Sequence, residues 1–197
     1  MPRHDKSKQL THFSASLRDA VETFESLHSL EPQVVAAAEM VLSALQAGSK
    51  LLLCGNGGSA ADSAHIATEF TCRFQDDRRP YPAIGLSVDG GLLTAIGNDY
   101  AFQEIFSRQV RAYGKPGDVL VALTTSGKSR NVLSAIEEAR RLGVKTIALL
   151  GKGGGFTKGA ADLEIIVPGT VTARIQEAHK FLLHVICELV EPGLEKE

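Results

Sequence analysis

Apolar runs of four or five residues recur along the chain, separated by longer segments with helical periodicity. The five runs lie at residues 50–54, 83–86, 119–123, 146–150 and 163–167. Between them, segments such as residues 131–142 place apolar side chains three or four positions apart, as on one face of an amphipathic helix. Mostly apolar runs of this length are typical of parallel strands that are covered on both faces. The pattern therefore predicts repeated βαβ units in a doubly wound α/β sheet.

Two helical segments, residues 10–27 and 32–45, precede the first predicted strand. Such a pair can pack between subunits as an arm, or it can cover the sheet of its own chain, and the sequence leaves both possibilities open. A further helix, around residues 175–190, follows the last strand. Because 197 residues suit a single core, we expect one domain, with residues 1–47 as a helical arm and residues 48–197 as the α/β core.

Composition excludes several classes of protein. Apolar residues make up 44% of the chain and charged residues 22%, as in ordinary globular proteins. The formal net charge is −2 and the basic residues are scattered, so we expect no nucleic-acid ligand. No stretch approaches the roughly 18 apolar residues that span a bilayer, and we expect no membrane association and a cytoplasmic location. The cysteines match no disulfide or zinc-finger spacing, so we expect them to be reduced and to serve in packing.

The loop after the first strand, residues 54–61, is rich in glycine and is a candidate binding loop. In sheets of this kind, ligands bind outside the carboxyl ends of the strands. The glycines permit close backbone approach, the free amides suit an oxyanion, and Ser59 can cap the following helix. A dinucleotide site is the alternative, because Gly55, Gly57 and Ala60 satisfy Gly-x-Gly-x-x-Gly/Ala.

The loop after the third strand leads directly into a helix and carries four hydroxyl side chains, Thr124, Thr125, Ser126 and Ser129. These hydroxyls, the backbone amides around Gly127 and the positive end of the helix can together bind a phosphate dianion. A nucleotide P-loop is excluded, because that motif requires glycine where this chain has Ala122. The dinucleotide fingerprint includes no second hydroxyl-rich loop, so a small phosphorylated ligand is the better hypothesis.

Residues 151–155, after the fourth strand, are interpreted as a flexible glycine-rich connection.

Four ordered motifs, at residues 54–70, 95–100, 124–131 and 175–184, resemble those of the sedoheptulose-7-phosphate isomerases of the sugar isomerase (SIS) superfamily. The resemblance covers nearly the whole chain. It implies a flavodoxin-like five-stranded sheet and a homotetramer with active sites between subunits. It also implies an aldose-ketose isomerase that converts D-sedoheptulose 7-phosphate to D-glycero-D-manno-heptose 7-phosphate for ADP- or GDP-heptose biosynthesis.

The resemblance assigns roles to residues by their motif position. The phosphate would be held by the hydroxyl side chains of Thr124, Thr125, Ser126 and Ser129. The sugar would be contacted by Asn56, Gly57, Gly58, Ser59, Glu69, Asn98, Asp99 and Gln176. Glu69 and His184 would transfer the protons of the reaction.

Members of this family are also known to bind zinc, which implies one ion per subunit at His65, Glu69, Gln176 and His184. His65 and Glu69 stand four positions apart, so both side chains lie on one face of a helix. Gln176 and His184 are roughly 12 Å apart along a helix, so a common ion requires long reach or two subunits. Taken alone, the His65 and Glu69 pair would more often be a hydrogen-bonded pair, and His179 is interpreted as a core or interface histidine.

An aldose-ketose isomerisation passes through an enediol and needs a base, an acid and a stabiliser of the oxyanion. We expect Glu69 to remove the proton from C1 and His184 to relay protons, with zinc or Asn56 stabilising the oxyanion. Three alternatives remain open. The first is a non-catalytic SIS-fold adaptor that binds a replication initiator, although such adaptors lack the catalytic glutamate that is present here as Glu69. The others are an isomerase of another sugar phosphate and a sugar-phosphate-sensing regulator.

Overall fold

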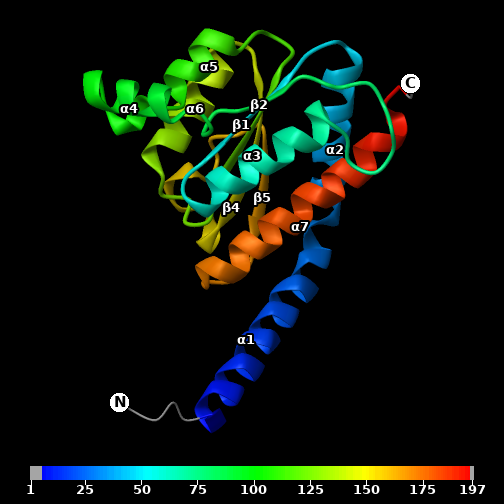
Figure 1. Ribbon diagram of the computed structural model, residues 1–197, viewed down its shortest axis with the longest axis vertical. Helices are drawn as coiled ribbons and strands as arrows, with labels where there is room; N and C mark the ends of the chain where they lie inside the picture. The colour runs from blue at the N-terminus through cyan, green and yellow to red at the C-terminus, as the bar shows by residue number, and fades with distance from the viewer. Residues whose placement is uncertain (1–5, 196–197) are drawn as a thin grey trace.

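The computed structural model describes residues 6–195 and shows a five-stranded parallel sheet with helices on both faces (Figure 1). The strand order is β2-β1-β3-β4-β5. The strands are β1 (Leu51–Gly55), β2 (Ala83–Gly85), β3 (Val119–Thr124), β4 (Lys145–Gly151) and β5 (Leu163–Val167). The helices are α1 (Lys6–Ser26), α2 (Glu31–Gln46), α3 (Gly58–Thr71), α4 (Gly90–Asp99), α5 (Ser107–Tyr113), α6 (Arg130–Arg141) and α7 (Thr172–Val190). Short 3-10 helices are η1 (Leu27–Leu30), η2 (Phe102–Glu104), η3 (Lys152–Thr157) and η4 (Glu191–Gly193). The predicted doubly wound, flavodoxin-like sheet is confirmed.

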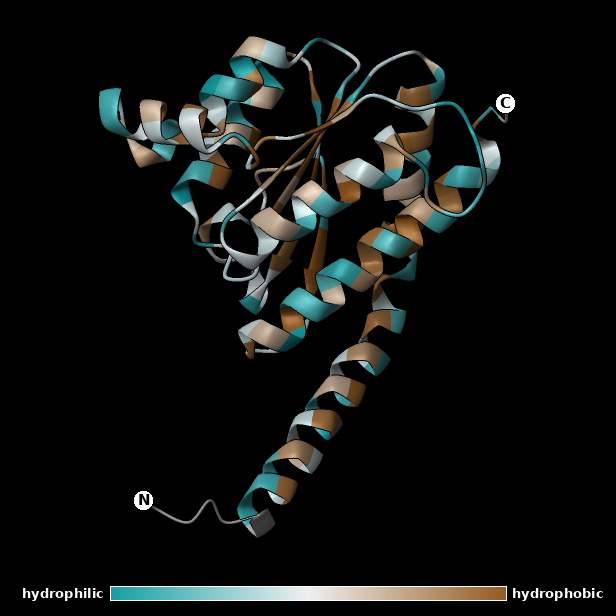
Figure 2. Ribbon diagram, in the orientation of Figure 1, coloured by the Kyte–Doolittle hydropathy of each residue, from teal (hydrophilic) through white to brown (hydrophobic). Residues whose placement is uncertain are grey.

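Alternate side chains of each strand enter different halves of the core, because successive residues of a strand point to opposite faces. On β1, Leu51 and Leu53 join the cluster that α2, α3 and α7 cover. Leu52 and Cys54 join the second cluster, to which α4, α5 and α6 contribute. Figure 2 shows mostly hydrophobic strands between helices that carry both hydrophobic and hydrophilic residues. Burial on both faces explains why the strands are recognisable as apolar runs.

Helix α1 projects away from the sheet (Figure 1), and its apolar side chains are largely exposed. These side chains repeat at three- and four-residue intervals as Leu10, Phe13, Leu17, Val21 and Phe24, with exposures from 68% down to 37%. The possibility that the whole helix pair covers its own sheet is therefore wrong for α1. It holds for α2, which contributes Val34, Ala37 and Val41 to the core. Residues 1–5 of the predicted arm lie outside the described residues, and the division at residues 47 and 48 stays a prediction.

The strand register brings three loops to the same edge of the sheet. Gly55 at the end of β1 pairs with Leu123 of β3, and Thr124 at the end of β3 pairs with Leu150 of β4. The chain continues to β2 on one side of β1 and to β3 on the other, so β1 and β3 flank the topological switch point. Ligands of open α/β sheets bind at such a point. The predicted binding loops therefore meet where the fold favours a ligand.

Two of the three cysteines are packing residues, as expected. Cys54 and Cys187 are buried, and burial raises the pKa of both thiols to about 12. Cys72 is exposed, so the same expectation is wrong for it. All three are free thiols.

None of the helices within residues 6–195 is long and apolar enough to cross a bilayer.

Candidate active site

The hydroxyl loop after β3 closes on itself in a compact arrangement. Thr124 Oγ1 lies 3.1 Å from Ser129 Oγ and 3.4 Å from Ser126 Oγ. The backbone amide of Lys128 donates to Ser126 Oγ at 3.1 Å. Ser129 occupies the N-cap position of α6, but its side chain makes no capping bond because its hydroxyl lies beside Thr124. The first turn of α6 therefore opens into the ring of hydroxyls, which is a favourable site for an anion.

The glycine-rich loop after β4 supports this cradle from behind. Thr157, which is fully buried, donates its backbone amide and its hydroxyl to the carbonyl of Gly127 at 3.1 and 2.9 Å. Gly127 has φ of +62°, and a Cβ placed there would lie 2.0 Å from the carbonyl oxygen of Gly154. The interpretation of residues 151–155 as a flexible connection is therefore wrong. The loop packs against the hydroxyl loop and fixes its shape.

The glycine loop after β1 differs from the prediction in the residue that caps α3. Helix α3 begins at Gly58, and its N-cap is Gly57 with φ of +57° and no side-chain cap. Ser59 lies inside the first turn, is 6% exposed, and accepts from Ser63 through its carbonyl. The prediction that Ser59 caps the helix is wrong, because the positive φ of Gly57 starts the helix two residues early.

A pair of amide side chains joins the two loops. Asn56 Nδ2 donates to Asn131 Oδ1 at 2.9 Å, and Asn131 Nδ2 donates to Asn56 Oδ1 at 2.7 Å. Asn131 is 2% exposed and also accepts from the amide of Val132. The predicted sugar contact Asn56 is thus held beside the predicted phosphate loop. Asn131 was not among the predicted site residues. Asparagine side chains are mostly exposed, so a buried one at the start of an amphipathic helix is unusual.

Gln176 meets the start of α3 from α7. Its Nε2 donates to Asp62 Oδ2 at 3.1 Å, and Lys180 Nζ lies 3.1 Å from Asp62 Oδ1. A Cβ placed on Gly58 would lie within 2.5 Å of three atoms of the Gln176 amide. The amide therefore lies directly over Gly58. Asp62, which is 2% exposed, was not predicted as part of the site.

His65, Glu69 and His184 form a separate cluster between α3 and α7. His65 Nε2 lies 3.0 Å from Glu69 Oε1 and 3.1 Å from His184 Nε2. One ligand atom from each of the three residues lies within 4.8 Å of the others. Two imidazole nitrogens and a carboxylate oxygen are a donor set that zinc prefers, and tetrahedral ligands about 2.1 Å from an ion stand roughly 3.4 Å apart. The three residues therefore fit a zinc-sized cation.

The two groups of predicted site residues on one chain lie apart. Glu69 is eleven positions from Gly58 along α3, which is roughly 16 Å at 1.5 Å per residue. His184 is eight positions from Gln176 along α7, or roughly 12 Å. The structure brings three of the four predicted metal ligands together, and it places the fourth, Gln176, on Asp62 at the loop end of α3.

Asn98 and Asp99 lie apart from the other predicted residues. They end α4, both are exposed, and Asn98 Nδ2 donates to Asp99 Oδ1 at 2.8 Å. Helix α4 packs on the second half of the core, and Figure 1 places it on the opposite side of the molecule from α7. Within one chain these two residues do not reach the cluster of His65, Glu69 and His184.

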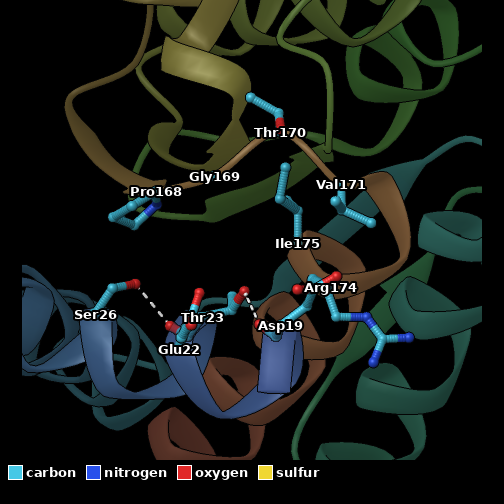
Figure 3. A pocket seen from close by; sticks show the side chains of 10 residues that line it. All are labelled: Asp19, Glu22, Thr23, Ser26, Pro168, Gly169, Thr170, Val171, Arg174 and Ile175. Atoms are coloured by element: carbon cyan, nitrogen blue, oxygen red, sulfur yellow. Dashed lines mark hydrogen bonds between the residues drawn. The ribbon is translucent and has the colours of Figure 1, made fainter. Parts of the chain in front are cut away.

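A cavity of about 280 Å³ lies elsewhere, where α1 meets the loop before α7 (Figure 3). Asp19 and Glu22 of α1 line one side, and Arg174 of α7 lines the other. Arg174 Nη1 donates to the carbonyl of Ser16 and so ties α7 to α1. None of the predicted site residues lines this cavity.

Comparisons with known proteins point to one family. The family model described as "SIS domain" matches residues 12–151. A phosphoheptose isomerase of Geobacter sp. (strain M21) is 50% identical over 186 residues, which are 94% of this chain and 97% of that protein. The solved phosphoheptose isomerase of Neisseria gonorrhoeae is 42% identical with a TM-score of 0.82, covering 95% of this chain and 98% of that one. That of Francisella tularensis is 37% identical with a TM-score of 0.90, covering 93% and 98%.

Proposed function

Because the chain belongs to the phosphoheptose isomerases of the SIS-domain family, we propose that it interconverts D-sedoheptulose 7-phosphate and D-glycero-D-manno-heptose 7-phosphate in heptose biosynthesis. The observation that carries this proposal is the hydroxyl ring of Thr124, Ser126 and Ser129 at the start of α6. It offers a phosphate dianion both hydroxyl donors and a helix N-terminus. Thr125, in the same loop, completes the predicted phosphate contacts.

The carboxylate of Glu69 is the base in the proposed reaction. It removes a proton from C1 of the ketose while the carbonyl oxygen on C2 gains a proton, which gives the enediol. Return of the carbon-bound proton to C2, with loss of the proton from the C1 hydroxyl, gives the aldose. His184 is placed to relay the proton between the two oxygens, because its Nε2 belongs to the same cluster as the Glu69 carboxylate. Asn56 donates toward the sugar from the switch point.

Zinc is the proposed cofactor, held by His65, Glu69 and His184. When bound, such an ion supplies positive charge that stabilises an oxyanion on the substrate. The same geometry supports a role for His65 in orienting the carboxylate, since its Nε2 is 3.0 Å from Glu69 Oε1.

We further propose that each active site is shared between subunits of a homotetramer. An extended heptose phosphate spans about 10 Å from C1 to phosphorus at carbon–carbon distances near 1.5 Å. The acid–base cluster of one chain lies roughly 16 Å along α3 from the loop end of that helix. The ligand is therefore shorter than the distance from the loop end of α3 to the cluster of the same chain. A second chain that presents Glu69 and His184 to the phosphate cradle of the first would bring the cluster within reach of the sugar. The apolar stripe of α1 offers surface for such association.

Subunit mixing tests the shared site. A Glu69→Gln protein and a Ser126→Ala/Ser129→Ala protein, each inactive alone, are unfolded together and refolded as a mixture. If cradle and carboxylate come from different chains, hybrid oligomers contain intact sites and activity returns. If one chain holds a whole site, the mixture stays inactive. Light scattering on the eluted wild-type protein measures the number of chains directly.

Incubation of the purified protein with sedoheptulose 7-phosphate, followed by detection of the aldoheptose phosphate, tests the reaction itself. Parallel assays with phosphorylated pentoses and hexoses test the substrate size. Absence of turnover on every sugar phosphate would favour the adaptor alternative instead. The cytoplasmic location stays a prediction, which fractionation of cells that express a tagged chain would test.

A further inference from the structure

The ring of Phe74 lies against the imidazole of His184, although Phe74 is not among the predicted site residues. The two ring centroids are 6.0 Å apart and the ring planes are inclined by 23°, which is a stacked arrangement at a distance where aromatic rings attract. Phe74 belongs to residues 72–82, the segment between α3 and β2, and it is half-buried against the core cluster that α2, α3 and α7 cover. The imidazole also meets the ring of His65 edge-on, with centroids 5.3 Å apart.

Glu191, at the start of η4, holds the segment that carries Phe74. Its Oε2 accepts from the backbone amides of Gln75 and Asp76, the two residues after Phe74, at 3.0 and 3.2 Å. Its Oε1 accepts from Arg78 Nε at 3.2 Å. The carboxylate is buried, and hydrogen bonds shielded from water are strengthened. Glu191 therefore fixes the backbone on the C-terminal side of Phe74.

Arg78 joins the same segment to the end of α3 that carries Glu69. Its guanidinium donates to the backbone carbonyls of Glu69 and Phe70. These carbonyls belong to the last turn of the helix, where no amide of the helix is left to pair with them. Because Arg78 is paired with Glu191 as well, the segment and the end of α3 are held together, and the positions of Phe74 and Glu69 are set by one network.

We propose that Phe74 is a positioning residue that fixes the orientation of the His184 imidazole within the acid–base and metal cluster. This inference rests on the proposed function. The torsion that turns a histidine ring has broad minima, so the orientation of the ring depends on its neighbours. Nε2 of His184 has to point toward the cluster, where it lies 3.1 Å from His65 Nε2. A flat ring stacked on the imidazole resists rotation of its plane and so keeps Nε2 in that direction.

This role has a kinetic signature that differs from that of general packing. His184 belongs to the donor set proposed for zinc, and outer groups that orient a metal ligand affect both metal affinity and turnover. The phosphate cradle at the start of α6 is a separate group of residues and stays intact when the stacked ring is removed. Loss of the ring should therefore lower kcat and zinc affinity together and leave KM near its wild-type value.

Phe74→Leu tests the proposal, because leucine keeps an apolar side chain on the core but has no flat ring. We expect its zinc affinity, measured by competition with a chromophoric chelator, to fall about five- to tenfold, as the loss of one aromatic contact predicts. We expect kcat for sedoheptulose 7-phosphate to fall by a similar factor, with KM within twofold of wild type. Phe74→Tyr keeps the ring and should keep both zinc affinity and kcat within twofold of wild type.

Phe181→Leu is the matched control for zinc affinity. Phe181 lies on α7, three positions before His184, but its ring packs on Phe24 of α1, with centroids 5.2 Å apart. Its removal costs the same helix one aromatic ring without touching the cluster, so zinc affinity should stay unchanged. Circular dichroism and urea denaturation check that each variant is folded under the conditions of the assay.

Two further measurements identify the residue through which Phe74 acts. In a His184→Ala background, Phe74→Leu should change zinc affinity less than twofold, because the imidazole that the ring orients is gone. Glu191→Gln displaces the ring without changing it, since a glutamine cannot accept with both of its terminal atoms. It should lower zinc affinity as Phe74→Leu does, and the two substitutions together should lower it little further than either alone.

Several results would overturn the inference. Wild-type zinc affinity and kcat in Phe74→Leu would show that the stacked ring is unimportant. An equal loss of zinc affinity in the His184→Ala background would show that Phe74 acts by another route, and a rise in KM with unchanged kcat would place its effect on substrate binding. A wild-type protein that binds zinc but isomerises no sugar phosphate would overturn the proposed function instead, and zinc affinity would still decide the role of Phe74.

Discussion

The Nε2 atom of His65 lies 3.1 Å from the Nε2 atom of His184, although the two residues come from different helices. Two imidazole nitrogens at this distance share either a proton or a cation. We expect the purified protein to bind one zinc ion per chain, and His184→Ala to lower zinc affinity by at least about 100-fold. Affinity should also fall as the pH falls, because ligands must be unprotonated to bind. Competition with a chromophoric chelator measures both effects.

Glu177→Gln is the control for this measurement, since Glu177 lies on the same helix and pairs with Arg174 away from the cluster. It should leave the zinc affinity unchanged. Equal affinities for wild type and His184→Ala would exclude this cluster as the zinc site.

Glu69→Gln should abolish most turnover without affecting folding. The amide keeps the size of the side chain but cannot take a proton from C1, and we expect kcat to fall by at least about 100-fold. Circular dichroism and light scattering check that the variant folds and assembles as wild type does. A variant with wild-type kcat would refute the role of Glu69 as the base.

The buried His179 makes the stability of the protein depend on pH. Its Nε2 lies 3.0 Å from the carbonyl oxygen of Leu150, its Nδ1 has no hydrogen-bond partner in the described structure, and burial lowers the pKa of the imidazole from 6.5 to about 4. The unfolded chain then takes up this proton at a higher pH than the folded one. Stability is lost as the pH falls from about 6.5 toward 4, by roughly 3 kcal/mol at most.

His179→Gln removes the titrating group and can keep the bond to Leu150. Urea denaturation at pH 7 and pH 4.5 should show a smaller loss of stability for the variant than for wild type. Glu138 adds little to this comparison, because hydrogen bonds from Arg141 and Arg111 lower its pKa from 4.5 to about 2, so its stabilisation is lost mainly below pH 4.5 and equally in both proteins. The same loss in both proteins would contradict the assignment.

Arg78→Ala should destabilise the fold at the end of α3. Arg78 pairs with Glu191 at 3.2 Å, with side-chain exposures of 2% and 8%, and it donates to the carbonyls of Glu69 and Phe70 at the end of α3. Removing one partner of a buried pair costs about 3 to 5 kcal/mol. Urea denaturation measures this loss. Arg79→Ala, which removes a solvent-exposed pair with Glu195 and a cation–π contact with Tyr81, is the control and should lower the denaturation midpoint much less than Arg78→Ala does.

Gly127→Ala should damage the phosphate cradle through contact with the neighbouring loop. Its Cβ would meet the carbonyl of Gly154, so the hydroxyl loop must shift, and we expect kcat/KM to fall at least about tenfold. Gly153→Ala is the control, because Gly153 also has positive φ but a Cβ there would meet nothing within 4 Å. Equal kinetic effects of the two substitutions would mean that the contact with Gly154 is unimportant.

The sheet and its loops could be predicted because burial leaves a local signal. The runs at β1, β3 and β4 are apolar because both faces of the sheet are covered, and the hydroxyl loop is conspicuous as a short stretch of one residue type. The start of α3 was mispredicted because a positive φ at Gly57 is a property of the backbone that no neighbouring residue type reveals.

The polar groups that hold the site in place could not be predicted in the same way. Arg78 and Glu191 are 113 positions apart, and Asp62 and Gln176 are 114 apart. Each of these residues is typical of an exposed surface when considered alone. Their positions depend on partners that come close only when α7 and η4 pack against α3 and the loop that follows it.

The exposed stripe of α1 has a consequence for measurements at low protein concentration. An isolated chain leaves Leu10, Phe13 and Leu17 in water, so association and hydrophobic burial are coupled. If the active site is shared between subunits as proposed, dilution below the dissociation constant of the oligomer would separate the two halves of each site. Specific activity would then fall with dilution and recover on concentration, which makes enzyme concentration itself a variable in every assay of this protein.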